Sequence, residues 1–402
     1  MSNLSDVMTL PLQIPETIPN DWSWRNLVEL CNPKQWKTIS NSDLTETGYR
    51  VFGANGFIGF YHEFNHEDET ISVTCRGATC GTVNLIPPRT YITGNSMCLD
   101  NLSREVSKFY LFYATQFRTF SDVISGSAQP QITAEGMKKV CLPIPPLPEQ
   151  KKIASILTSV DEVIENTQKQ IDKLQDLKKA TMNELLTKGI GHTEFKDSEF
   201  GRIPKSWEVV TLEEISEALI DYRGKSPPKS DKGIPLITAK NIRMGFIKME
   251  PKEFIEETSF NQWMVRGIPK FGDIFFTTEA PLGFVAMVPE YKHAVGQRVI
   301  TISPRREIFD PQFLCYQLQG ETFQKQLVDS STGSTVTGIK QSTLRKILLC
   351  VLPLSEQQKI IEMVSSIDIR IDQVSIKLTQ TQSLKKSLMQ DLLTGKVRVT
   401  VN

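Results

Sequence analysis

The chain has 402 residues, 39% of them hydrophobic and 23% charged, and its 46 basic side chains balance 46 acidic ones, so the formal net charge is zero. This composition can bury two cores, shows no secretory or membrane segment, and predicts a soluble, cytoplasmic protein without a membrane partner. The seven cysteines include no C-x-x-C pair, which argues against a disulfide framework or a four-cysteine zinc site. No segment has the strong basic excess that would let it hold nucleic acid by phosphate contacts alone.

Short β-rich runs and helical patterns alternate along the chain. Runs of β-branched and aromatic residues bounded by Gly, Pro or Asn predict strands at 50–53, 70–74, 82–86, 235–238, 273–278 and 299–303. Helical patterns near 105–117 and 311–327 belong to the same two variable segments. Proline-rich stretches at 142–148 and 351–355 then lead into long helices, and we expect each proline run to end before the first helical turn.

An internal repeat is the strongest signal in the chain. Residues 149–187 and 356–394 align without a gap at an offset of 207, with 15 of 39 positions identical, which implies two-fold pseudo-symmetry. The flanking landmarks also repeat, since 18–22 matches 203–207 at an offset of 185. About 22 residues have therefore been gained inside the second variable segment, where loops tolerate insertion.

Each repeated segment carries a coiled-coil seam. Apolar residues recur at alternating spacings of three and four, and each helix would be about 58 Å long at about 1.5 Å per residue. The seam residues are Leu157, Val160, Ile164, Ile171, Leu174, Leu185, Val364, Ile367, Ile371, Val374, Leu378, Leu388 and Leu392, with Thr167, Lys178, Thr181, Thr381 and Lys385 completing the register. We expect the two copies to pair with each other, because a lone helix would expose its apolar stripe. A pair of ordinary core helices is the alternative.

One motif points to a different chemistry. Residues 62–66 read H-E-x-x-H, the spacing with which two histidines on one helix bind zinc. The preceding residues 56–61 are β-like and contain two glycines, and no third-ligand motif follows. We therefore predict a solvated loop here and no metal in this chain.

Together, these features resemble the DNA specificity subunit of type I restriction-modification systems, over nearly the whole chain. The supporting stretches, beside the Pro-x-x-Glu-Gln helix starts and Leu-Leu-Thr ends, are 48–59, 126–132, 221–229, 272–283, 296–298 and 331–339. The resemblance predicts an α+β protein in which two pseudo-symmetric α/β target recognition domains are separated by two long helices that form an antiparallel intramolecular coiled coil. The expected boundaries are 1–20 for an N-terminal tail, 21–141 for the first recognition domain, 142–201 for the central repeat helix and linker, 202–348 for the second recognition domain, and 349–402 for the C-terminal repeat helix.

The resemblance also implies a function without catalysis. In that family each domain reads one half of a split double-stranded DNA site, the helices act as spacer, and the subunit docks two modification (methyltransferase) subunits and restriction/translocase subunits. S-adenosylmethionine and ATP would belong to those partners, so no cofactor is expected here. The sequence has no G-x-x-x-x-G-K-[ST] phosphate loop and no Asn-Pro-Pro-Tyr or Asp-Pro-Pro-Tyr run. The alternative is a non-catalytic coiled-coil scaffold whose flanking domains bind peptides or saccharides.

Candidate base-reading residues occupy turns between the predicted strands. Arg and Lys suit guanine, Asn and Gln suit adenine, and carboxylates suit cytosine. The candidates are Tyr49, Asn55, Arg76, Thr79 and Asn95 in the first domain, and Arg223, Lys225, Lys229, Lys240, Asn241, Arg243, Glu279, Gln297 and Arg298 in the second.

Overall fold

The computed structural model describes residues 15, 17–126, 129–222, 226–331 and 338–400. The chain divides into two compact units, residues 1–169 with 375–402, and residues 170–374. Each unit holds one variable segment together with part of both repeat helices. No helix in the described part of the chain is both long and apolar enough to cross a membrane.

The first unit is built from short strands and few helices. In chain order they are β1 (Ser23–Asn26), α1 (Leu27–Leu30), β2 (Asn32–Gln35), η2 (Asn41–Asp43), β3 (Tyr49–Gly53), β4 (Gly56–Tyr61), β5 (Thr70–Thr74), β6 (Val83–Ile86), β7 (Thr90–Ile92), β8 (Ser96–Asp100), α2 (Lys108–Arg118), β9 (Ile124–Ser125), β10 (Gln131–Ile132), α3 (Ala134–Met137) and β11 (Cys141–Ile144). The predicted strands at 50–53, 70–74 and 82–86 are confirmed as β3, β5 and β6.

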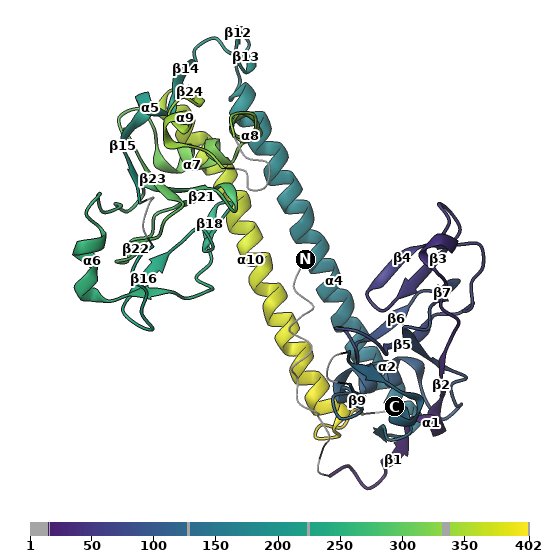
Figure 1. Cartoon of the computed structure of the whole chain (residues 1–402). Helices are drawn as coiled ribbons and strands as arrows, with labels where there is room; N and C mark the ends of the chain where they lie inside the picture. Colours follow the sequence, from purple (N-terminus) through teal and green to yellow (C-terminus); the bar gives the residue numbers. More distant parts are fainter. Residues whose placement is uncertain (1–14, 16, 127–128, 223–225, 332–337, 401–402) are drawn as a thin grey trace. The chain divides into compact units, whose positions relative to one another are not determined.

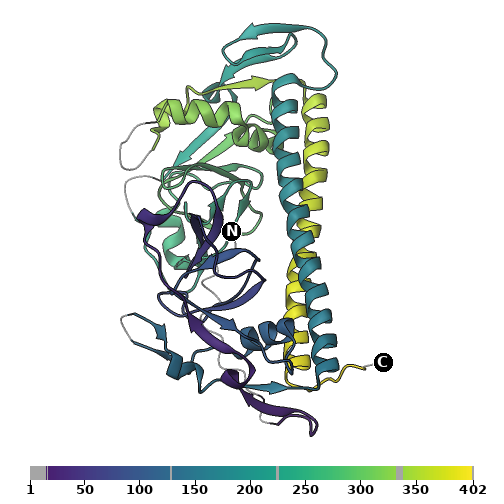
Figure 2. The same cartoon turned by 90° about the vertical axis from the view of Figure 1, so that its right-hand side faces the viewer.

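Two sheets organise this unit. An antiparallel sheet has the order β2-β8-β5-β6, and a three-stranded sheet has the order β4-β3-β7, in which β3 and β7 are parallel. Helix α2 buries Tyr110, Leu111 and Ala114 in the same core as the start of the first repeat helix and the end of the second. Figure 2 shows α2 lying against these two helix ends.

The second unit has more elements. They are β12 (Phe195–Ser198), β13 (Gly201–Pro204), β14 (Glu208–Thr211), α5 (Leu212–Ile215), β15 (Ser216–Asp221), β16 (Ile234–Ile237), β17 (Ile242–Arg243), β18 (Phe246–Ile247), β19 (Phe254–Ile255), α6 (Glu257–Trp263), β20 (Ile274–Thr278), β21 (Leu282–Met287), β22 (Ala294–Val295), β23 (Val299–Pro304), α7 (Pro311–Gln319), α8 (Glu321–Asp329), α9 (Gln341–Leu344) and β24 (Leu348–Val351). The predicted strands at 235–238, 273–278 and 299–303 are confirmed as β16, β20 and β23. The single helix expected near 311–327 is instead two, α7 and α8, which meet at Gly320.

The second unit repeats the sheet topology of the first. Its antiparallel sheet β15-β23-β20-β21 corresponds to β2-β8-β5-β6, and its three-stranded sheet β19-β16-β22 corresponds to β4-β3-β7, including one parallel pair. Strand β14 pairs with β24 just before a repeat helix, as β1 pairs with β11. In Figure 1 the helices α7, α8 and α9 gather beside the start of the second repeat helix. The two units are therefore copies of one architecture, which confirms the predicted α+β duplication.

The extra residues of the second unit lie in two places. Phe52 and Ile237 occupy equivalent positions at the end of β3 and β16, because their carbonyls accept from the amides of Thr93 and Gly296 at 2.9 and 2.8 Å. Their numbers differ by 185. Equivalent residues of β8 and β23 differ by 203 instead, since Ser96 pairs with Thr74 of β5 and Val299 pairs with Thr277 of β20. Most of the extra residues therefore lie between β16 and β22, in the segment that contains β17, β18 and α6. The remaining ones lie between β23 and residue 339.

The long helices are α4 (Leu147–Lys188, 42 residues) and α10 (Leu354–Leu393, 40 residues). Both extend to within two residues of the predicted ends. Helix α4 starts earlier than expected, so Pro148 lies in its first turn. Backbone N–H groups in the first turn have no acceptor within the helix, so a proline, which lacks this N–H, is tolerated there.

None of the thirteen predicted apolar seam residues, all in the described part of the chain, is exposed, and their role as a coiled-coil seam stays a prediction. Six of them are buried and seven half-buried. In the first unit Asp161 pairs with Lys385 while Leu157 shares a core with Leu392, so the helix segments run antiparallel. The same direction holds in the second unit, where Lys178 pairs with Asp368 and the later residues of α4 share a core with the earlier residues of α10.

Candidate nucleic-acid interface and its frame

Each repeat helix begins with a glutamate that anchors a tryptophan. In the first unit Trp22 donates its indole N–H to Glu149 at 3.1 Å, and Arg398 contacts the same carboxylate at 2.7 Å. In the second unit Trp207 donates to Glu356 at 3.2 Å, and His192 lies 2.7 Å from that carboxylate. A carboxylate near a helix N-terminus is stabilised by the exposed amides there. The repeated Glu and Trp of the sequence are thus one contact made twice.

The neighbouring glutamines tie each helix start to its domain. Gln150 donates to the carbonyls of Glu105 and Pro145 and accepts from the amide of Ser107 at 2.8 Å. Gln357 donates to the carbonyls of Ile308 and Leu352, and the amide of Asp310 donates to it at 2.8 Å. Both side chains are buried. Each glutamine therefore satisfies three backbone groups of the domain and of the approach to the helix, and ties the start of its helix to its domain.

A second repeated contact joins the helices to the domains midway along each seam. Asp161 accepts from Tyr113 at 2.8 Å and pairs with Lys385 at 2.6 Å, while Asp368 accepts from Tyr316 at 3.0 Å and pairs with Lys178 at 2.6 Å. Burial raises the pKa of both tyrosine hydroxyls. The two aspartates, like the two lysines, stand at equivalent positions of the repeat, but their pairing requires the antiparallel register and is not visible in the sequence.

Backbone hydrogen bonds define a matching loop frame at one end of each antiparallel sheet. In the first unit the amide of Cys75 donates to the carbonyl of Asn95 at 2.9 Å, and the amide of Ile132 donates to Cys75 at 3.0 Å. In the second unit the amide of Thr278 donates to Arg298 at 3.0 Å, and the amide of Ile339 donates to Thr278 at 3.1 Å.

The residues that follow Cys75 and Thr278 also match. Arg76 forms an isolated bridge with Gln131, and Glu279 forms one with Gly338. Positions 76 and 95 are therefore equivalent to 279 and 298. All four residues are candidates from the sequence, and none is buried.

The other first-domain candidates lie around this frame or on β3. Thr79 donates to Asn55 at 3.0 Å and to the carbonyl of Ala54, so these residues join the tip of the β3–β4 hairpin to the turn after β5. Tyr49, at the start of β3, packs on Phe64 and lies 3.4 Å from Arg89. Their role in base contact stays a prediction.

The second-domain candidates differ in whether their side chains are accessible for contact with a base. Asn241 is 1% exposed, and its amide bonds to Thr238, Lys248 and Pro251. It therefore cannot read a base, and its selection from the sequence was wrong because an Asn that closes a buried turn looks like one on a surface turn. Arg223 and Lys225 lie outside the described residues.

Three further candidates have structural partners. Lys229 pairs with Glu253 at 2.6 Å, Arg243 donates to two backbone carbonyls, and Gln297 donates to Ser226 at 2.9 Å. Lys240 is exposed. Their role in DNA contact stays a prediction.

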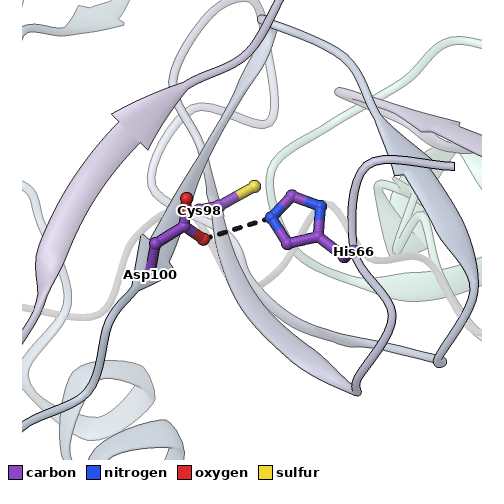
Figure 3. A group of neighbouring side chains, drawn as sticks. All are labelled: His66, Cys98 and Asp100. Carbon is purple, nitrogen blue, oxygen red and sulfur yellow. Dashed lines mark hydrogen bonds and ion pairs between the residues drawn. The ribbon is translucent and has the colours of Figure 1, made fainter.

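The H-E-x-x-H motif lies outside any helix. His62 is exposed, as expected of a solvated loop, but His66 is buried, which the sequence did not predict. In Figure 3, His66 faces Asp100 and Cys98 of β8. The His66 ring nitrogens lie 3.1 Å from Asp100 Oδ1 and 2.7 Å from Asn65 Oδ1.

This His66 group has metal-ligand chemistry but is bonded internally. The three donor atoms of His66, Cys98 and Asp100 lie within 4.8 Å of one another, and imidazole, thiolate and carboxylate are all zinc ligands. However, both imidazole nitrogens already face oxygens, Trp36 donates to the second Asp100 oxygen at 3.0 Å, and burial raises the pKa of the Cys98 thiol. The group is best explained as a link between β8 and the turn before β5, and the absence of metal stays a prediction.

Comparison with known proteins gives one consistent family. A model described as "Type I restriction modification DNA specificity domain" matches residues 19–176 and 204–381. The MjaVIII specificity subunit of Methanocaldococcus jannaschii is 32% identical over 311 residues, covering 75% of this chain and 73% of that protein. A putative MjaX specificity subunit from the same organism is 31% identical over 317 residues, covering 76% and 72%.

Solved structures show the same fold. A type I restriction-modification S subunit from M. genitalium matches with a TM-score of 0.60 at 19% identity, covering 97% of this chain and 99% of that one. A chain from a study of type I complex assembly and conformational transition matches with a TM-score of 0.56 at 15% identity, covering 95% and 100%. The chain belongs to the family of type I restriction-modification DNA specificity subunits.

Proposed function

We propose that this chain is the sequence-reading subunit of a cytoplasmic type I restriction-modification complex. Each recognition domain reads one half of an asymmetric, two-part DNA site, and the helices α4 and α10 act as the spacer. The chain also docks two modification subunits and the restriction subunits, which supply S-adenosylmethionine and ATP chemistry. Half-site spacing in DNA recognition follows protein geometry, so two unlike domains on one repeated frame suit such a site.

One observation carries this proposal. The two units repeat the same sheets and the same helix anchors, yet their equivalent loop positions carry different side chains, Arg76 and Asn95 against Glu279 and Arg298. A repeated frame with divergent, unburied polar tips favours two readers of different sequences. It disfavours a scaffold that presents two copies of the same peptide-binding or saccharide-binding surface, which would keep the tip chemistry.

The outer faces of the helices provide a matched pair of docking positions. Leu177 on α4 and Leu384 on α10 differ by the repeat offset of 207, and both are about half exposed, at 51% and 53%. Contact of an exposed leucine with a partner removes apolar surface from water, which is favourable. One such position in each unit supports binding of two equal modification subunits.

Co-purification tests the assembly. The chain co-expressed with the modification subunit of its system is expected to yield a complex with two modification subunits to one specificity subunit. Leu177→Glu and Leu384→Glu should each weaken binding of one modification subunit. Gln175→Glu and Gln382→Glu, also exposed and also related by the offset of 207, are matched controls and should leave the complex intact. A chain that never retains a modification subunit would favour the scaffold alternative.

A further inference from the structure

The two positions at the end of each antiparallel sheet form what we call the tip pair: Arg76 with Asn95 in the first unit, and Glu279 with Arg298 in the second. Backbone hydrogen bonds and bridges alone establish that these positions are equivalent, independently of their side chains. Equivalent members of the two pairs differ in number by 203 in both cases, so the segment between the pair members, with β6 and β7 in the first unit and β21 and β22 in the second, has the same length in both units. The backbone therefore presents two side chains in the same way twice, and only the chemistry differs.

The second tip pair holds an arginine in a defined orientation. Arg298 Nε lies 2.7 Å from Glu279 Oε1, and the side chains are 54% and 37% exposed. Among the described residues no acceptor binds the two terminal guanidinium nitrogens. These two nitrogens form the fork that binds guanine O6 and N7 in the major groove. Glu279 therefore acts as a positioning residue that leaves the reading edge of Arg298 open.

The backbone at this tip is strained. Arg298 has a φ of 71° and Ala280 a φ of 44°, although neither is glycine. Such conformations are uncommon for residues other than glycine and persist where the surroundings fix them, often at ligand-binding loops. The direction of the Arg298 side chain is therefore set both by its backbone conformation and by the contact of its Nε with Glu279.

The first tip pair carries the two side chains with the clearest base preferences. Arg76 is exposed and Asn95 half-buried. In the described part of the first unit, neither side chain has a hydrogen-bonding or ion-pair partner. Arginine is suited to guanine and asparagine to adenine, and each forms two hydrogen bonds to its base. In the first tip pair the arginine, Arg76, follows β5, whereas in the second the arginine, Arg298, precedes β23.

We propose that the tip pairs determine base specificity, one pair for each half-site. Arg76 and Arg298 each bind a guanine, Asn95 binds an adenine beside the Arg76 contact, and Glu279 orients Arg298. This inference rests on the proposed function of the chain as a DNA reader. It goes further in assigning the reading to two equivalent positions, and it explains why one frame recognises two different sequences.

Methylation mapping of variants tests this assignment. The chain is expressed with its modification subunits as wild type, Arg298→Ala, Arg298→Lys or Arg76→Ala, and methylated sites are sequenced genome-wide. Arg298→Ala should reduce discrimination roughly 10- to 100-fold at one guanine of one half-site and leave the other half-site unchanged. Arg298→Lys should lose most of it too, because lysine lacks the fork. Arg76→Ala should affect only the opposite half-site.

Control variants separate reading from folding. Arg345, paired with Glu213, and Arg25, paired with Glu29, lie on the same units away from the tips, and their alanine variants should keep the full motif. A uniform loss at all sequences, or no change in either tip variant, would overturn the assignment. A wild-type complex that methylates no split motif would instead contradict the proposed function itself.

Discussion

At the scale of single residues, His293 is a buried imidazole that the proposed function does not use. It is 5% exposed, packs edge-on against Phe275, and lies 2.7 Å from the carbonyl of Tyr291 through Nδ1. Burial lowers the pKa of His293. The unfolded chain therefore binds a proton on this residue near pH 6.5 that the folded chain excludes, so folding stability falls as pH drops below about 6.5.

The test is the pH dependence of unfolding. His293→Asn keeps a donor for the Tyr291 carbonyl but cannot titrate, so its free energy of unfolding should decline less between pH 7 and pH 5 than that of the wild type. Denaturant unfolding at several pH values measures this. His62→Asn, at an exposed position, is the control and should follow the wild type. Parallel curves for all three proteins would show that His293 does not contribute.

The His66–Asp100 link makes a second residue-scale prediction. Asp100→Asn removes the carboxylate that faces both His66 and Trp36 in a nearly buried setting, and should lower the free energy of unfolding by about 3 kcal/mol. Metal analysis of the wild-type protein is expected to find no stoichiometric zinc. Zinc that is bound by the wild type and lost in Asp100→Asn would instead make the group a metal site.

Residue chemistry was the hardest level to predict from the sequence. Asn241 and Asn95 both stand in turns between strands, but one is buried and fully bonded while the other is accessible. Likewise His66 appeared to belong with His62, four residues away, whereas its contacts come from β8, more than thirty residues later. Local patterns give no information about such long-range contacts, so the equivalence of the tip pairs became visible only in the backbone hydrogen bonds.

At the scale of elements, the contacts of Lys385 with Asp161 and of Lys178 with Asp368 set the register of the helices. They lie at equivalent places on the seam, and each lysine also sits over a tyrosine ring, at 5.4 and 5.6 Å. The lysine side chains are both 19% exposed, so solvent screens these pairs less than surface pairs. We infer that these polar contacts select one alignment of an otherwise apolar seam.

A double-mutant cycle tests this role. Lys385→Met and Asp161→Asn, alone and together, should show a coupling of about 1 kcal/mol in the free energy of unfolding, because the two groups lose the same contact. The Lys178 and Asp368 pair should give a similar value. Lys386 and Glu162, exposed neighbours on the same helices, provide the control cycle, and a coupling no larger than theirs would remove the register role.

The helices were predictable because their signal is long. A repeated pattern of 39 residues fixed the ends of α4 and α10 to within two residues, whereas the break between α7 and α8 at Gly320 was missed because a single glycine in a short helix is a weak signal. Strands were located correctly where β-branched runs were continuous. Their pairing, including the parallel pairs β3–β7 and β16–β22, depends on contacts between distant segments and was not predictable.

At the scale of the whole molecule, the proposed spacer role depends on helix length. Insertion of seven residues into α4 and seven into α10, at positions related by the repeat offset, adds about 10 Å to each helix while preserving the seam. The number of unread bases between the half-sites should then increase by about three, since base pairs repeat every 3.4 Å. Methylation mapping gives the spacing. An unchanged spacing with both half-sites intact would show that the helices do not set it.

The duplication itself was the most predictable property of the molecule. The offsets of 185 and 207 at the two ends of the second domain already required extra residues there, and the structure contains β17, β18 and α6 in that region. The net charge, by contrast, did not indicate where DNA would bind. A total of zero carries no information about the position of single arginines such as Arg76 and Arg298.

The most direct test of the central claim is methylation mapping of a cell that carries this chain with its modification subunits, compared with the same cell lacking only this chain. Two dissimilar reading domains on one repeated frame predict modified adenines in a two-part, asymmetric motif with unread bases between the parts, and loss of that motif when the chain is deleted. A contiguous or palindromic motif, or methylation that persists without this chain, would contradict the account.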